Sequence, residues 1–263
     1  MPIYVDTHTH LYLDAFDEDR TQVVNLALEN GVRQLLLPNV DAETLAPMLR
    51  LCDQFAGICM PMIGLHPTSV REDFEHVLQQ MKPLLTRQDV VAIGETGIDL
   101  YWDTAYYLQQ IDSFRLQIQW ALEYDLPIVI HCRNSIDEIM QVLEPFEGKG
   151  LKGVMHCFPG NAHQADWFTR FGLMLGIGGV VTYKNSMMAK VVEHVDLNCL
   201  VLETDAPYLP PVPHRGKRNQ PDYLLHVAAR IAEIKGLSLK TVAMETTQNA
   251  SRLFNLNLSE TSL

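Results

Sequence analysis

Short apolar runs alternate with longer amphipathic stretches along nearly the whole of this 263-residue chain. Eight of the apolar runs have the length and composition of strands, and they lie at residues 3–8, 34–39, 59–66, 90–95, 127–131, 153–157, 173–178 and 199–205. Their apolar residues are continuous rather than alternating, which is typical of parallel strands that are covered on both faces. The alternation therefore predicts an α/β protein built on a parallel sheet.

Helical patterns fill the segments between these runs, with clear examples at 17–31, 104–124 and 161–172. In the last of these, Asn161 is expected to cap the start of the helix and Gly172 to end it. Eight strand–helix units in a chain of this length predict a (β/α)8 TIM barrel. A doubly wound open sheet is the alternative, because alternation by itself does not show that the sheet closes.

The predicted barrel forms a single domain over residues 1–263, and two further helical patterns, at about 222–235 and 238–253, would complete it and add an extra C-terminal helix. No run of 18 apolar residues and no basic segment followed by an apolar one is present, so we expect a cytoplasmic protein without membrane contact. The five cysteines lack C-x-x-C spacing and are expected to be reduced. Nothing in the sequence indicates an obligate protein partner.

The net charge of the chain is −12. Such a charge argues against capture of nucleic acid or an anionic membrane by the whole surface. It leaves room for a local phosphate site, because bound divalent cations reverse the sign of the charge around them. Any nucleic-acid activity should therefore be confined to a pocket.

Histidines and carboxylates close the predicted strands. In chain order these residues are His8, His10, His66, Glu95, His131, His156 and Asp205. The carboxyl ends of barrel strands meet at the face that carries the active site. Burying so many polar groups there without partners would be costly, and bound metal would supply the partner. The pattern predicts a metal centre at the mouth of the barrel.

These strand ends supply six candidate ligands for metal. Six are too many for one tetrahedral zinc with an open position, and they suit two divalent ions. Glu95 lies midway around the ring and is the expected bridge between them. Imidazole and carboxylate ligands accept zinc, magnesium or manganese, so the metal is left open.

Other residues near the strand ends have expected supporting roles. Glu203 and Asp6 would lie one layer below Asp205 and His8 and orient ligands by hydrogen bonds. Strand alternation would turn Cys132 and Cys157 toward the helices, as packing residues.

The ordered segments resemble those of the TatD family of metal-dependent deoxyribonucleases, in the amidohydrolase superfamily. The segments that carry the resemblance are "DTHTHL" (6–11), "GLHP" (64–67), "GETGID" (94–99), "HCR" (131–133), "HCF" (156–158) and "ETDAPYL" (203–209). The resemblance implies a (β/α)8 barrel and cleavage of phosphodiester bonds in DNA, often as a 3′–5′ exonuclease. It also implies six metal ligands, which are His8, His10, Glu95, His131, His156 and Asp205. Pro159 and Asn134 depart from the family's more frequent Ser and Asp. These two departures put the substrate preference in doubt more than metal binding.

The segment "VPHRGKRNQP" (212–221) is the one dense basic cluster in an acidic chain. It follows the last predicted strand, so Arg215 and Lys217 are expected to bind substrate phosphate. Asn219 is expected either to fix this loop or to donate to a phosphate oxygen. The glycines of "GIGG" (176–179) would let backbone approach the substrate, although glycines alone are weak evidence.

Four aromatic residues follow the fourth predicted strand and would either stack on bases or cover the barrel top: Tyr101, Trp102, Tyr106 and Tyr107.

Together with the resemblance, these observations predict a two-metal hydrolase that cleaves DNA by means of a metal-activated water. As in the family it resembles, it is expected to act as a 3′–5′ exonuclease on single strands. The expected catalytic residues are Asp205 as the base for that water, His66 as phosphate ligand or general acid, and Glu203. Two alternatives stay open. One is an amidohydrolase-type enzyme for another bond, such as an aminoacyl-tRNA ester, and the other is a metal-binding scaffold without turnover.

Overall fold

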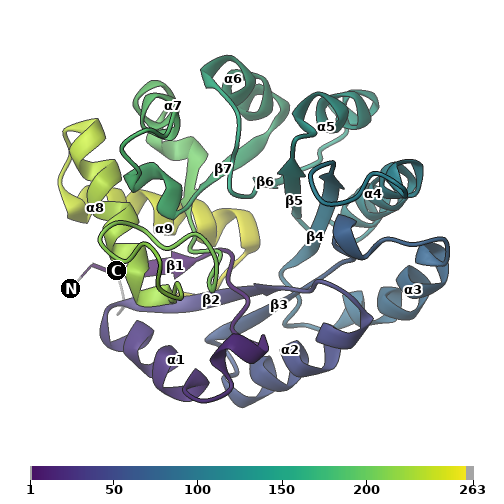
Figure 1. Cartoon of the computed structure of the whole chain (residues 1–263), viewed down its shortest axis with the longest axis horizontal. Coiled ribbons are helices and arrows are strands. Elements are labelled where there is room, and N and C mark those ends of the chain that lie inside the picture. The colour runs from purple at the N-terminus through teal and green to yellow at the C-terminus, as the bar shows by residue number, and fades with distance from the viewer. Residues whose placement is uncertain (1, 259–263) are drawn as a thin grey trace.

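The computed structural model describes residues 2–258 as a ring of strands surrounded by helices (Figure 1). All eight predicted strands are present, namely β1 (Tyr4–Asp6), β2 (Val32–Pro38), β3 (Cys59–Ile63), β4 (Ala92–Asp99), β5 (Ile128–Arg133), β6 (Gly153–Met155), β7 (Leu173–Ile177) and β8 (Leu200–Leu202). Each strand pairs in parallel with the next one along the chain. The predicted bounds of the domain include Met1 and residues 259–263, which lie outside the described residues.

The ring closes between the first and last strands. Thr7 N donates to Leu202 O at 3.0 Å, and a parallel bridge joins Thr9 to Ala206 just beyond the strand ends. The prediction of a (β/α)8 barrel is therefore confirmed, and the open-sheet alternative is wrong.

Helices cover the outer face of the barrel (Figure 1). Those of the described residues are α1 (Arg20–Glu29), α2 (Ala42–Gln54), α3 (Phe74–Met81), α4 (Tyr107–Glu123), α5 (Ile136–Leu143), α6 (Ala162–Phe171), α7 (Met188–His194), α8 (Leu224–Lys235) and α9 (Leu239–Phe254). Asn161 caps α6 by accepting from Gln164 N, and Gly172 ends it with a φ of 106°. Within residues 2–258, none of the helices has the length and apolar character needed to cross a membrane.

Helix α9 closes one end of the barrel. Apolar side chains of the strands, such as Val5, Leu36 and Val129, form one cluster with Leu253 and Phe254 at the end of α9. Figure 1 shows α9 passing behind the strands. Because this helix seals the N-terminal end, the opposite end is the one left for a functional site.

None of the eight strands ends at the predicted residue, and the differences in three of them bear on the site. β4 continues to Asp99, and its pairing with β5 shifts register between Ile93 and Thr96. β1 ends at Asp6 and β8 at Leu202, so the polar residues that follow them lie in loops. Backbone bonds tie these two loops together, with Asp205 N donating to the carbonyl of His8 and the N–H of His10 donating to Ala206 O.

Candidate metal centre

The carboxylate of Glu95 is buried among imidazoles from several strands. One oxygen, Oε2, lies 3.1 Å from His8 Nε2 and 3.7 Å from His10 Nε2. Asp205 approaches the same pair, with Oδ1 at 3.4 Å from His10 Nε2 and 3.9 Å from His8 Nε2. The second Glu95 oxygen, Oε1, faces a different group of residues. The two oxygens thus serve two neighbouring sets of nitrogen donors.

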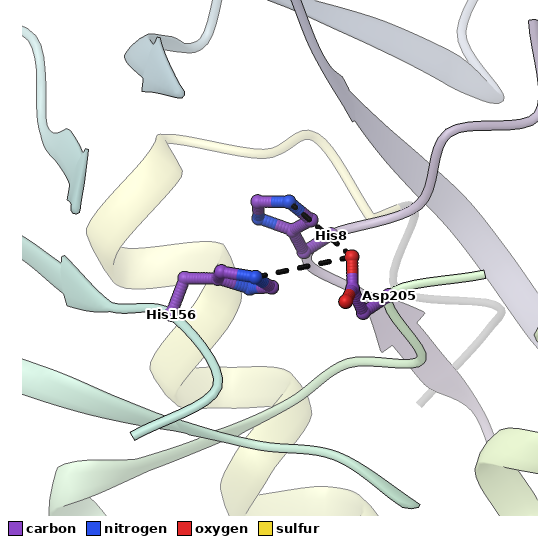
Figure 2. Close-up of side chains that lie close together, drawn as sticks. All are labelled: His8, His156 and Asp205. Atoms are coloured by element: carbon purple, nitrogen blue, oxygen red, sulfur yellow. Dashed lines mark ion pairs between the residues drawn. The ribbon is translucent and has the colours of Figure 1, made fainter. Parts of the chain in front are cut away.

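That second set comes from β5 and from the loops that follow β3 and β6. Glu95 Oε1 lies 2.9 Å from His131 Nδ1, 3.5 Å from His66 Nε2 and 3.7 Å from His156 Nε2. His156 also stacks on His8 with ring centroids 3.5 Å apart. Figure 2 shows the Asp205 carboxylate beside both of these rings, 3.8 Å from His156 Nε2. All six predicted ligands therefore converge on one small volume.

The charge of Glu95 and the protonation of His8 suit a cation. Burial by itself would raise the pKa of Glu95, but the surrounding imidazoles, His66 foremost, hold it well below its usual range. Burial lowers the pKa of His8 to about 4. Glu95 is therefore an anion and His8 a neutral donor at neutral pH, which are the forms that bind a divalent ion.

The protonation of His10 is fixed by its neighbour Tyr12. The Tyr12 hydroxyl donates its hydrogen to Pro38 O at 2.5 Å, so its oxygen accepts from His10 Nδ1 at 2.8 Å. Nδ1 then carries the proton, and Nε2 presents a lone pair toward Glu95 and Asp205. A nitrogen lone pair facing two carboxylates calls for a shared cation, so these residues fit a metal ion.

Carboxylates hold the outer ring nitrogens of two more histidines. His131 Nε2 donates to Asp99 Oδ2 at 2.9 Å, which turns Nδ1 toward Glu95. His156 Nδ1 lies 3.1 Å from Glu203 Oε1, at ion-pair distance although not aligned as a hydrogen bond. Such carboxylate–histidine pairs are typical of metal sites, where they fix the ring and raise its basicity.

Sequence reasoning missed both Asp99 and Tyr12. Asp99 ends the "GETGID" segment, and Tyr12 follows the H-x-H pair by two residues, so a signal was available for each. Glu203, which was predicted to orient a ligand, lies beside His156.

Asp6 was expected to orient a ligand ring, and the structure gives it a different role. Its carboxylate accepts from the backbone N–H groups of His8 and Thr204 and lies 2.5 Å from the Thr204 hydroxyl. It therefore positions the backbone of the two loops and not an imidazole ring. The reason is that β1 ends at Asp6, so strand alternation does not extend to His8.

Cys157 also lies elsewhere than strand alternation predicts. Its φ of +41° takes the chain out of the strand, and its N–H donates to Glu203 Oε1. The residue lines the cavity at the barrel mouth. Gly176, in turn, makes room for a side chain, because a Cβ there would lie 2.3 Å from Glu203 Oε2. The expectation that this glycine admits substrate is replaced by a packing role.

His66 has a tautomer that differs from that of the other imidazoles. Thr68 N donates to His66 Nδ1 at 3.1 Å, and the Thr68 hydroxyl lies 2.6 Å from the same nitrogen. Burial lowers the pKa of His66, so the ring is neutral, with its proton on Nε2. That N–H points into the centre, 3.2 Å from His131 Nδ1. His66 is thus close enough to join the ligands but is set up as a hydrogen-bond donor.

A cavity of about 1030 Å³ opens over the cluster. The predicted phosphate clamp does not belong to its lining. Arg215 instead lies over the ring of Tyr183 at 4.4 Å, and the buried Asn219 donates both amide hydrogens, to Thr204 O and Tyr208 O. Asn219 therefore fixes the loop, the first of its two expected roles. Lys217 is likewise absent from the residues that line the cavity.

A (β/α)8 barrel that gathers imidazoles around a buried carboxylate at its open end has the architecture of a metal-dependent hydrolase. The family model described as TatD related DNase matches residues 5–255. The chain belongs to this TatD family.

Known relatives agree with this assignment. The uncharacterized metal-dependent hydrolase YabD of Bacillus subtilis is 37% identical over 96% of this chain and 99% of its own length. The 3′-5′ ssDNA/RNA exonuclease TatD of Pectobacterium carotovorum is 32% identical over 95% of this chain and 99% of its own. Among solved structures, the TatD homologue YjjV of Escherichia coli superposes with a TM-score of 0.88 at 30% identity, covering 96% of this chain and 98% of that one. The sequence-based family prediction is confirmed, and the chain is a metal-dependent hydrolase and not a scaffold.

Proposed function

We propose that this protein is a two-metal hydrolase that cleaves phosphodiester bonds of single-stranded DNA from the 3′ end. The observation that carries the proposal is the Glu95 carboxylate, whose two oxygens face two separate groups of histidines. The exonuclease name of the Pectobacterium relative supports the choice of substrate. The reaction is expected to take place in the cytoplasm, and the five free cysteines are consistent with a reducing compartment.

We infer two sets of ligands for these ions. One ion would be held by His8 and His10 with Asp205, a second by His131 and His156, and Glu95 would bridge them. When bound, two zinc, magnesium or manganese ions would polarise a phosphoryl oxygen and lower the pKa of a water. Glu203 and Asp99 hold the rings of His156 and His131 in the required orientation.

Asp205 and His66 would then transfer the protons. Burial would raise the pKa of Asp205, but the imidazoles that surround the carboxylate lower it. Asp205 is therefore ionised at neutral pH and able to accept a proton from the attacking water. His66, with its proton on Nε2, is able to donate to a phosphate oxygen or to the departing alkoxide.

One assay tests the proposal. Protein stripped of metal and resupplied with single divalent ions is given single-stranded DNA labelled at the 5′ or the 3′ end, and in parallel an aminoacyl ester. We expect stepwise shortening of the 5′-labelled strand and early release of label from the 3′-labelled one. Turnover of the ester without cleavage of DNA would reject the proposal in favour of the aminoacyl-ester alternative.

A further inference from the structure

An arginine with unpaired donors stands at the rim of the cavity. Arg133 lines the cavity and follows His131 by two residues on β5, so it lies about 7 Å further along the strand. Its guanidinium carbon lies 3.8 Å from the centre of the Tyr101 ring and 5.1 Å from that of Trp102. Within residues 2–258, its side chain makes neither a hydrogen bond nor an ion pair. The rings therefore hold the guanidinium in place while its N–H groups stay free.

The two rings are themselves tied to the metal centre. Tyr101 N and Trp102 N donate to Asp99 Oδ1 at 2.9 and 3.1 Å. The other oxygen of the same carboxylate accepts from His131 Nε2. One buried side chain thus fixes both the turn that carries the aromatic rings and a candidate metal ligand. The position of the rings relative to the metal centre is accordingly set.

Exposure of the rings shows which surface is open to a ligand. Trp102 is 67% exposed and Tyr101 53% exposed, and Trp102 lines the cavity. By contrast, Tyr106 lies under the guanidinium of Arg71, and Tyr107 packs partly buried against the core. An exposed indole beside a free guanidinium combines the two contacts that single-stranded nucleic acids make, which are base stacking and a charge-assisted bond to phosphate.

We propose that Trp102 and Arg133 form a nucleotide subsite beside the metal centre. Arg133 binds the phosphate next to the scissile one, and Trp102 stacks on an unpaired base. This inference rests on the proposed function, since it assumes that a phosphodiester occupies the centre. It deepens that function, because a base held in a duplex cannot offer its face to Trp102, and the subsite therefore selects single strands. Among the described residues that line the cavity, Arg133 is the one Lys or Arg side chain.

Steady-state kinetics of the metal-loaded enzyme give the first test. The substrates are a single-stranded thymidine hexamer and methyl p-nitrophenyl phosphate, which has neither a base nor a second phosphate. We expect Trp102→Ala to raise KM for the hexamer by about 5- to 100-fold, the effect of one lost base stack. Trp102→Phe should recover part of the loss. The small ester should be hydrolysed at nearly the wild-type rate by both variants.

Arg133→Gln is expected to raise KM for the hexamer and to lower the slope of log KM against log salt by about 0.7, the value for one phosphate contact on a single strand. Lys149→Gln is the matched control. It also removes one positive charge from a cation–ring pair, with Nζ 5.3 Å from the Phe146 ring, in the segment that leads into β6 at the opposite end of the barrel. This control should change neither KM nor the salt slope.

A binding measurement separates the two proposals. A phosphorothioate thymidine hexamer, which resists hydrolysis, should quench the tryptophan fluorescence of wild-type protein but not of Trp102→Phe, and a blunt duplex should quench neither. If the wild type cleaves the hexamer and both subsite variants behave like Lys149→Gln, the subsite is wrong while the proposed function stands. If the wild type cleaves no DNA, the proposed function fails. Absence of quenching by the hexamer would then reject the subsite as well.

Discussion

Replacing Gly176 by alanine should disturb the metal centre without touching a ligand. A Cβ at this position would lie 2.3 Å from Glu203 Oε2 and 2.7 Å from its Cδ. Ordinary contact begins near 3.4 Å, so the carboxylate must move by about 1 Å. Glu203 is completely buried inside the barrel, which leaves little space for such a shift. The movement would carry Oε1 away from Cys157 N and from His156 Nδ1.

The size of the effect follows from these contacts. Overpacking a tight interior costs about 1–3 kcal/mol, and weakening a hydrogen bond to a buried charge adds about 1.5–3 kcal/mol. Because the two costs partly replace each other as the side chain relaxes, we expect the free energy of unfolding to fall by about 2–4 kcal/mol. Loss of the carboxylate behind a ligand histidine lowers metal affinity by about 10- to 100-fold.

Gly178→Ala is the matched control on the same segment. Its Cβ would meet Glu203 O at 3.5 Å and Cys157 Sγ at 3.7 Å, which are ordinary contacts, and its φ of −110° suits alanine. We expect a change in unfolding free energy within about 1 kcal/mol and no change in metal affinity. Competition titration against a chelator measures the affinity, and unfolding in urea followed by circular dichroism measures the stability. If Gly176→Ala binds metal as tightly as Gly178→Ala does, Glu203 does not support His156 and the reasoning is refuted.

Four further variants test the remaining roles. Glu95→Gln should lower the metal content at both positions, because the bridge is lost, and elemental analysis that still finds two ions per chain would exclude bridging. Tyr12→Phe should weaken metal binding by about 10- to 100-fold in a chelator titration, since His10 Nδ1 loses its acceptor. His66→Ala should retain both ions and slow DNA cleavage by about 10²- to 10⁴-fold, with a smaller effect on a p-nitrophenyl ester that needs little acid assistance, and equal slowing of both would refute the general-acid role. Arg215 and Lys217 changed together to Ala should raise KM for DNA if they bind phosphate, whereas unchanged kinetics would match their positions away from the cavity lining.

The sequence predicted the barrel and its polar mouth because both depend on local patterns. A buried parallel strand needs a continuous apolar run, and a histidine near the end of such a strand, such as His131 in β5, reaches the mouth by alternation alone. Because the strands follow one another around the ring, the polar residues at their ends meet at the mouth. Predicting this requires no information on side-chain packing.

The less predictable features depend on departures from regular strands. Glu95 lies within β4 at a register shift, and Cys157 turns into the cavity through a positive φ. Neither feature has a local pattern that specifies it. The roles of Tyr12 and Asp99 depend on their contacts with His10 and with His131 on the neighbouring strand, and the sequence motifs mark these residues without specifying which atoms meet. Basic residues near the last strand were likewise predicted to contact substrate from their position in the chain, but Arg215 turns toward Tyr183.

Charge at the mouth connects metal binding to substrate binding. The described residues that line the cavity include four carboxylates and a single arginine, listed here as Asp41, Glu95, Asp99, Asp205 and Arg133. On a chain with a net charge of −12, such a mouth repels phosphate. Two divalent cations would add four positive charges at its base and reverse this sign. In the proposed mechanism the same ions would both promote hydrolysis and let the substrate enter, while Arg133 would supply the fixed positive charge that positions it.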